Sequence, residues 1–127
     1  MKTVISTAEA PTAVGPYSQA IAAGGLVFCS GQIPLEPSSG VLIEGDISSQ
    51  TKRVLENLAA VLRAHGLTME HVVKTTVFLT DLANFGEMNT VYAQWFPNEP
   101  PARSTIQVAA LPKGANVEIE AIAFKPF

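Results

Sequence analysis

A ten-residue stretch near the middle of the chain, HVVKTTVFLT at 71–80, constrains the fold more than any other feature. The stretch is rich in β-branched residues and is apolar on most of both faces, which is typical of a central strand covered on both sides. Amphipathic helices are predicted before and after it, at 47–65 and 85–96, and together they can cover one face of a sheet. We therefore expect other subunits to cover the second face, most simply in a closed symmetric ring.

Both helices have start and stop signals in the sequence. Asp46 precedes the first helix as a favoured N-cap residue, and Gly66 suits the left-handed backbone that commonly ends a helix. Asn84 and Glu87 are spaced as a capping pair at the start of the second helix, and Pro97 lies just beyond its end. These signals predict one helix on each side of the central strand in the sequence.

Two predicted hairpins complete the sheet. The segments 19–23 and 26–30 are apolar and flank two glycines, which favour a tight hairpin turn. A second hairpin is expected between a strand that begins at Arg103 and the last strand, 117–124. The order of elements predicts an α+β fold, with a mixed β-sheet and both helices packed on one face, in a single domain that spans residues 1–127.

Composition excludes several kinds of partner. A formal net charge of −3 without a basic cluster argues against a nucleic-acid surface. No uninterrupted apolar run approaches the ~20 residues needed to cross a bilayer, so we expect a cytoplasmic protein with no membrane partner. Charged residues make up 15% of the chain, against about 25% in ordinary domains, and this shortage favours burial of surface in an oligomer.

The residue types that most often bind metals are not grouped in the sequence. His65 and His71 have no cysteine or carboxylate partners at ligand spacing, so no metal site is predicted. The single cysteine, Cys29, lies in an apolar strand, where packing is a commoner role than catalysis.

Arg103 is the strongest candidate for a binding residue in the sequence. Two prolines restrict the backbone just ahead of it, and alternation along the strand places Thr105 on the same face. A guanidinium held in this way suits bidentate capture of a carboxylate or phosphate, and an ordinary surface arginine is the alternative. Glu118 would lie near the middle of the hairpin with the Arg103 strand, either as an ion-pair partner or as a catalytic carboxylate.

Other polar residues have two interpretations each. Tyr17 follows a glycine and a proline, so an ordered turn holds its hydroxyl, although packing alone could explain it. Gly31, after Ser30 at the end of a strand, allows another backbone to approach closely. Asn89 falls within the apolar stripe of the second helix, where its amide either ties down a loop or lines a site.

Six sequence motifs, in a fixed order and spacing, cover almost the whole chain. They are GPYSQA at 15–20, SGQIP at 30–34, VVKTTVFLTDL at 72–82, MN at 88–89, PPARST at 100–105 and LPKGANVEIEAIA at 111–123. Together they resemble those of the RidA (YjgF) family of enamine/imine deaminases. The resemblance implies a chorismate-mutase-like α+β fold, assembled as a homotrimer with three clefts between neighbouring subunits.

The resemblance also implies an activity and a set of roles. Family members hydrolyse reactive 2-aminoacrylate and other 2-imino acids to 2-oxo acids and ammonia, without a cofactor. Arg103 aligns with the arginine that binds the substrate carboxylate, and Glu118 aligns with the carboxylate that positions or activates the attacking water. The remaining matches lie in or beside the cleft: Tyr17, Ser30, Gly31, Asn89 and Thr105.

The chain differs from many family members at one position, and two functions other than deamination are considered. Many bacterial members have a cysteine where this chain has Thr105, which affects the expected substrate preference but not the reaction class. The main alternative is a regulatory trimer that binds small carboxylates with little turnover. The presence of both Arg103 and Glu118 favours the enzyme, because simple carboxylate binding needs only the arginine. Ribonuclease activity, also attached to family members, is disfavoured by the acidic balance of the chain.

Overall fold

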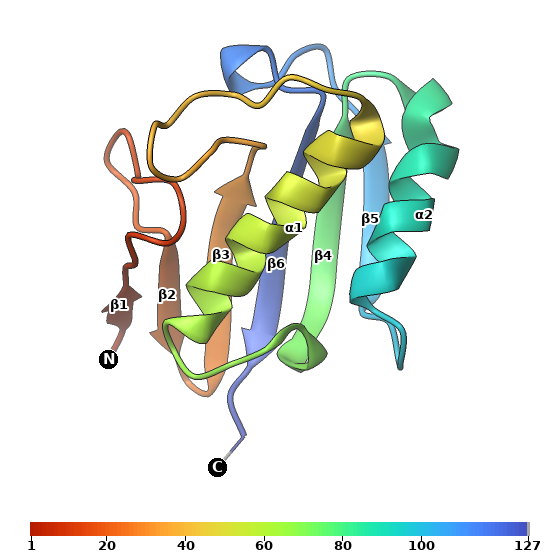
Figure 1. The fold of residues 1–127 in the computed structure, drawn as a ribbon. Helices are drawn as coiled ribbons and strands as arrows, with labels where there is room; N and C mark the ends of the chain where they lie inside the picture. Colours follow the sequence, from red (N-terminus) through yellow and green to blue (C-terminus); the bar gives the residue numbers. More distant parts are fainter. Residues whose placement is uncertain (127) are drawn as a thin grey trace.

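The computed structural model describes residues 1–126, which form one six-stranded sheet with two helices on the same face (Figure 1). The strand order is β1-β2-β3-β6-β4-β5. The strands are β1 (Thr3–Ile5), β2 (Ala20–Ala23), β3 (Leu26–Gln32), β4 (Val72–Leu79), β5 (Ala102–Gln107) and β6 (Val117–Phe124), and the helices are α1 (Ile47–Arg63) and α2 (Phe85–Trp95). The predicted α+β class with both helices on one face is confirmed.

The middle of the sheet is mixed. Strand β4 pairs in parallel with β5 and antiparallel with β6, and β6 pairs antiparallel with β3. The predicted central position of the stretch at 71–80 is therefore confirmed. The hairpin predicted at 19–30 is also present, because β2 and β3 pair antiparallel across Gly24 and Gly25, which both have positive φ angles.

The second predicted hairpin is wrong. Strand β6 does not pair with β5 but lies between β3 and β4, which leaves β5 at the edge of the sheet. The physical reason is burial. Alternate residues of β6 from Val117 to Ala123 are buried beneath the helices, which an edge position would not allow. Strand β5 has no fully buried residue, so it is suited to the edge.

The ends of the helices agree with the sequence in part. The side chain of Asp46 caps α1 by accepting from the N–H of Ser49 at 2.9 Å. Beyond the other end, Gly66 has a φ angle of 75°, and the N–H of Leu67 donates to the carbonyl of Leu62 at 3.0 Å. Both predictions for α1 are confirmed.

The predicted capping pair of α2 is wrong. The side chain of Asn84 makes no capping hydrogen bond. A 3-10 turn at Leu82–Asn84 runs directly into α2, so the cap lies earlier, at Asp81, which accepts from the N–H of Ala83 at 2.9 Å. The backbone of Asn84, with φ −86° and ψ 4°, does not have the extended conformation that an N-cap residue usually adopts.

The core fills the space between the helices and one face of the sheet. Fully buried residues of α1 meet fully buried residues of β4 and β6: Val54, Leu55, Leu58, Leu62, Val77, Leu79 and Ile119. Cys29 belongs to this core, and burial raises the pKa of its thiol to about 12. The packing role predicted for Cys29 is confirmed.

The second face of the sheet is partly apolar and open. Leu26, Phe28, Ile106 and Phe124 all keep about two fifths of their surface exposed, for example 43% for Phe28. Each of them alternates along its strand with residues that face the helices. Neither helix of residues 1–126 is long and apolar enough to span a membrane.

Candidate active site

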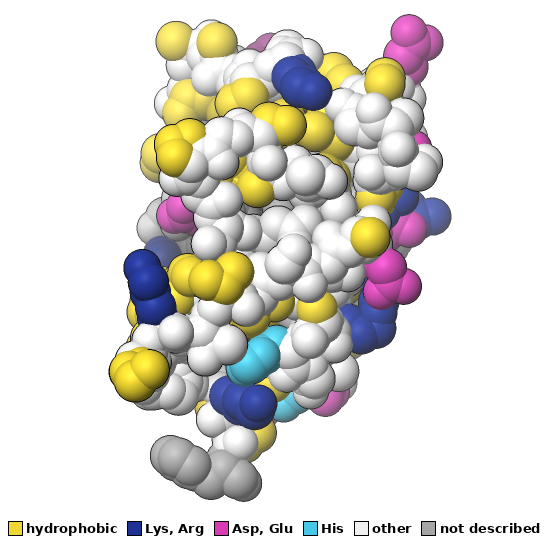
Figure 2. All heavy atoms as spheres, turned by 90° about the vertical axis from the view of Figure 1, so that its left-hand side faces the viewer, with side chains coloured by type: hydrophobic (Ala, Val, Ile, Leu, Met, Phe, Trp, Pro, Cys, Tyr) yellow, Lys and Arg dark blue, Asp and Glu magenta, His cyan; other side chains and the backbone are white. Residues whose placement is uncertain are grey.

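A cavity of about 490 Å³ lies at the loop end of β3 and β6. The loop before β2, the segment after β3 and the turn at Pro112–Gly114 surround it, and the open-face side chains of β6 contribute to its floor. Figure 2 views this side of the molecule, and hydrophobic side chains are visible at its upper end, where the loops lie in Figure 1. Four predicted site residues line the cavity: Tyr17, Ser30, Gly31 and Glu118.

The loop that contains Tyr17 is braced against β3. The hydroxyl of Ser30 donates to the carbonyl of Ser18 at 2.6 Å, and the N–H of Ser30 donates to the carbonyl of Gln19 at 3.0 Å. The N–H of Tyr17 donates to the carbonyl of Gly15 at 2.9 Å. The ring of Tyr17 nevertheless stays half exposed, at 50%. Packing within one chain therefore leaves half of this tyrosine uncovered, and its role in a site stays a prediction.

Gln19 is a cavity residue that the sequence analysis missed. Its buried side chain accepts from the N–H of Thr7 at 2.7 Å and donates to the carbonyl of Pro11 at 2.8 Å. These bonds fix the loop that forms one wall of the cavity. A polar amide directly before an apolar strand, within the motif GPYSQA, was the available signal.

Gly31 makes room for Glu118. A Cβ atom at Gly31 would overlap with Oε2 of Glu118, so no other residue fits without a shift. A register shift between Cys29 and Gln32 in the pairing with β6 occurs at the same place. The close approach predicted at this glycine is present, but the group that approaches is the Glu118 side chain and not, as predicted, another backbone.

The carboxyl of Glu118 is held in a partly buried position. Burial raises its pKa above the usual value, and the neighbouring charge of Glu120 raises it further. The only cationic side chain that lines the described cavity is Lys113, and its Nζ donates to the carbonyl of Gly40 at 3.1 Å.

The other predicted site residues form a second cluster between β5 and α2. The guanidinium carbon of Arg103 lies 4.8 Å from the ring centre of Tyr92 and 5.5 Å from that of Phe85. Tyr92, which the sequence analysis did not assign to the site, is fixed by a hydrogen bond of 2.6 Å between its hydroxyl and that of Thr75. The site therefore includes an aromatic support for the arginine.

Three buried side-chain oxygens have no hydrogen-bond partner within residues 1–126: Oγ1 of Thr51 in α1, Oδ1 of Asn89 in α2 and Oγ1 of Thr105 in β5. Oδ1 of Asn89 thus does not tie down a loop. Buried polar atoms normally have partners, so the oxygens of Asn89 and Thr105 are available to a group from outside the chain. Their place in a binding site stays a prediction.

The two clusters lie on opposite faces of the sheet. Arg103 is in register with Thr75 of β4 and stacks on α2, so it belongs to the helix-covered face. Glu118 alternates with the buried Val117 and Ile119 and therefore belongs to the open face. Strand β4 separates β5 from β6. One chain alone does not bring Arg103 and Glu118 together.

The ion pair considered for Arg103 and Glu118 is absent. The ion pairs within the described part of the chain are Arg53–Glu56 and Arg63–Glu9. The error follows from the hairpin, because pairing of β5 with β6 would have placed both residues on neighbouring strands. No group of three or more histidine, cysteine, aspartate or glutamate side chains in residues 1–126 is arranged to hold a metal ion.

The family is identified by comparison with known proteins. The sequence profile of a family described as Endoribonuclease L-PSP matches residues 7–125. The human protein named 2-iminobutanoate/2-iminopropanoate deaminase is 47% identical over 125 residues, which cover 98% of this chain and 91% of that protein. This chain belongs to the RidA (YjgF) family.

Solved structures of RidA relatives have the same fold. The crystal structure of RidA from the Antarctic bacterium Psychrobacter sp. is 44% identical, has a TM-score of 0.92 and is matched over 96% of this chain and 98% of that one. The structure of E. coli TdcF with bound serine is also 44% identical, with a TM-score of 0.93 and coverage of 98% and 99%. The RidA fold predicted from the six motifs is confirmed.

Proposed function

We propose that this protein hydrolyses reactive enamine and imine intermediates, 2-aminoacrylate and other 2-imino acids, to 2-oxo acids and ammonia. We further propose that it does so in a homotrimer, without a cofactor. The curated relatives named as 2-iminobutanoate/2-iminopropanoate deaminases support the reaction. The proposed trimer is supported by one observation: the predicted site residues are divided between the two faces of one chain.

In this proposal each cleft combines two subunits. The open face of one subunit supplies Glu118, Ser30, Gly31 and Tyr17, and the β5–α2 edge of its neighbour supplies the arginine cluster. The cavity beside Glu118 has a single cation that already binds a carbonyl, so a substrate carboxylate there needs Arg103 of the neighbour. The unpartnered atoms of Asn89 and Thr105 would gain partners at the same contact.

Arg103 would bind the substrate carboxylate. The rings of Tyr92 and Phe85, at 4.8 Å and 5.5 Å from the guanidinium carbon, support the side chain of Arg103. A planar fork of donors matches both oxygens of a carboxylate, which a lysine ammonium does not do. Binding in this way fixes the imine carbon relative to the rest of the cleft.

Glu118 would move the protons of the reaction. Water adds its oxygen to the imine carbon while one of its protons reaches the nitrogen, which gives a carbinolamine. Transfer of the hydroxyl proton to nitrogen then breaks the C–N bond, so the products are the 2-oxo acid and ammonia. The raised pKa of Glu118 brings it closer to neutral pH, where a carboxyl group exchanges protons more readily.

Mixed trimers test the shared cleft directly. Arg103→Ala and Glu118→Gln should each be inactive alone, measured by trapping of 2-imino acids that are generated in situ. In a 1:1 co-expressed mixture, about a quarter of the clefts receive both intact residues if neighbouring subunits share each cleft. Activity near a quarter of the wild-type value supports the proposal, and an inactive mixture of proper trimers contradicts it. Inactive wild-type trimers would contradict the deaminase itself.

A second candidate is a regulatory trimer that binds small carboxylates. E. coli TdcF was solved with bound serine, an amino acid, which favours ligand binding in this fold. Calorimetry with serine and 2-oxo acids separates the two candidates, because the regulatory trimer would bind them with no measurable imine hydrolysis. The single domain over residues 1–127, the cytoplasmic location and the lack of a nucleic-acid partner stay predictions.

A further inference from the structure

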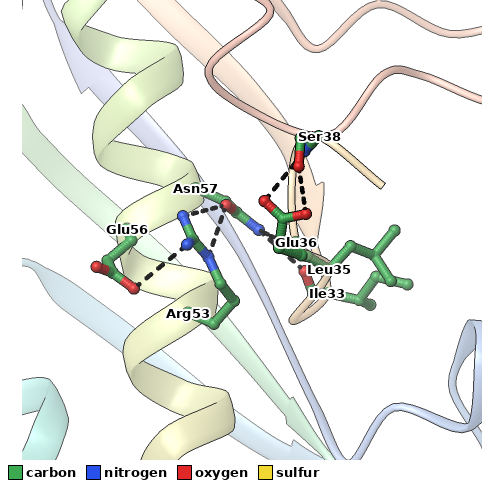
Figure 3. A network of polar contacts seen from close by, with 7 residues as sticks. All are labelled: Ile33, Leu35, Glu36, Ser38, Arg53, Glu56 and Asn57. Carbon is green, nitrogen blue, oxygen red and sulfur yellow. Dashed lines mark hydrogen bonds and ion pairs between the residues drawn. The ribbon is translucent and has the colours of Figure 1, made fainter. Parts of the chain in front are cut away.

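Asn57 on α1 holds one wall of the cavity from behind. Its fully buried side chain donates from Nδ2 to the carbonyl of Leu35 at 3.0 Å and to the carbonyl of Ile33 at 3.3 Å (Figure 3). Ile33 and Leu35 line the same cavity as Glu118, whereas Asn57 does not. A helix residue thus fixes the segment that follows β3.

Arg53 sets the orientation of that amide. Its Nε and Nη2 donate to Oδ1 of Asn57 at 3.1 Å and 2.9 Å. A guanidinium has donors only, so it can bind only the oxygen end of the amide. The NH2 end must then face the carbonyls of the cavity wall, and all four hydrogen-bonding positions of the amide are used. Nη1 of Arg53 is also 3.7 Å from Oε1 of Glu56, on the same helix.

The cavity wall at Ile33 and Leu35 is close in sequence to the backbone that contacts Glu118. Residues 33–35 follow Gly31, whose backbone packs so closely on the carboxyl of Glu118 that a Cβ atom would overlap with it. Movement of this segment would change the space and the water around the carboxyl. The other titratable groups that line the cavity are Tyr17, Lys113 and Glu120.

We propose that Arg53 and Asn57 are positioning residues, which set the cavity wall at Ile33 and Leu35 and, through Gly31, the place of the Glu118 carboxyl. The inference rests on the deaminase function proposed above. Both residues act through the backbone, because neither lines the cavity. They should therefore affect the rate of the chemical step more than the binding of the substrate carboxylate, which depends on Arg103.

The first test is Arg53→Met, which keeps the apolar length of the side chain and removes its donors. We expect kcat to fall about tenfold, with KM within about twofold of the wild type, because a displaced group costs rate before it costs binding. Arg53→Lys can still donate to Oδ1 and should retain most of the rate. Glu56→Gln is the matched control, since it removes only the ion pair and should leave kcat unchanged.

Two further measurements distinguish positioning from general stability. Because burial raises the pKa of Glu118, water that enters beside it should lower that pKa and move the acid limb of kcat/KM to lower pH in Arg53→Met. Amide hydrogen exchange should also quicken at Leu35 and Glu36, whose N–H groups donate to the carbonyls of Ile33 and Val41 at 2.7 Å and 2.9 Å.

Asn57→Asp gives a second variant, because it keeps the acceptor for Arg53 but turns a carboxylate oxygen toward two carbonyls. Faster exchange and a lower kcat in either variant support the inference. A folded Arg53→Met trimer with wild-type kcat, pH profile and exchange overturns it, even if Asn57→Asp fails to fold. If the wild type proves inactive, the deaminase fails, and exchange at Leu35 and Glu36 still decides whether Arg53 holds the wall.

Discussion

The Glu118 cluster and the Arg103 cluster differ in how far one chain completes them. Around Glu118, the hydroxyl of Ser30 and the amide of Gln19 have partners within the chain. Around Arg103, Oδ1 of Asn89 and Oγ1 of Thr105 are buried and unpartnered. The first cluster has its hydrogen-bond partners within one chain, whereas the second has buried polar atoms that residues 1–126 leave without partners. The comparison predicts that substitutions in the two clusters fail in different ways.

Arg103→Ala should have the largest effect. We expect kcat/KM to fall about a thousandfold, because the bidentate hold on the substrate carboxylate is lost. Arg103→Lys is the control for charge alone and should recover less than about a tenth of the activity. Imine-trapping kinetics measure both variants, and light scattering measures their assembly. A monomeric Arg103→Ala protein would show that the arginine is a structural residue.

Glu118→Gln should lower kcat about a hundredfold, as expected for loss of general acid–base catalysis. Affinity for a 2-oxo acid product, measured by calorimetry, should stay within about threefold of the wild type, since Arg103 is intact. Glu120→Gln is the matched control on the same strand face and should keep the maximal rate. Unchanged turnover in Glu118→Gln would remove this residue from the mechanism.

Gly31→Ala tests the close packing within the Glu118 cluster. The new Cβ would overlap with the Glu118 carboxyl, so we expect about a tenfold lower kcat and a loss of about 1–3 kcal/mol in the free energy of unfolding. Denaturant titration and kinetics measure the two effects. Gly86→Ala, where a Cβ meets nothing within 4 Å, is the control. Equal kinetics for the two alanine variants would contradict the close fit.

Thr105→Val tests the unpartnered polar atoms of the Arg103 cluster. Without the hydroxyl, the chain loses an unpartnered buried group, so the free energy of unfolding should stay the same or rise by up to about 1 kcal/mol. If substrate or a neighbouring subunit satisfies that hydroxyl, affinity for a 2-oxo acid should fall about threefold to tenfold. Thermal unfolding and calorimetry give both numbers. Unchanged affinity would place the hydroxyl outside the cleft.

The smallest expected effect is on stability as a function of pH. Burial raises the pKa of folded Glu118 above its unfolded value, so the folded chain holds this proton more tightly. Wild-type stability should therefore decrease as the pH rises from the unfolded pKa through the raised one. Glu118→Gln should be relatively more stable above that window and equal below it. Urea midpoints at several pH values measure the difference, and parallel curves would contradict it.

Sequence patterns predicted much of the local structure. Period-2 alternation and β-branched residues located the strands from β2 onward, and Asp46 and Gly66 marked the ends of α1, because these signals act within a few residues. The capping pair at Asn84 failed for a local reason too, since Asp81 offered an earlier cap for a 3-10 turn. Family motifs supplied the site residues, which spacing alone could not have grouped.

The order of the strands in the sheet could not be predicted from the sequence. Neighbours in sequence often pair, which favoured a hairpin of β5 with β6, but the buried face of β6 requires a central place. Without that order, Arg103 and Glu118 could not be assigned to opposite faces. The positioning pair of Arg53 and Asn57 was equally hidden, because its partners are backbone carbonyls more than twenty residues away.

If two subunits share each cleft, as proposed, activity depends on protein concentration. Since one face of the chain bears Glu118 and the other bears Arg103, an isolated chain would have every residue of the site and still no site. At concentrations well below the assembly constant, the number of working clefts would follow the third power of the free subunit concentration. A cell that halves its supply of this protein would then lose far more than half of its capacity to clear imines.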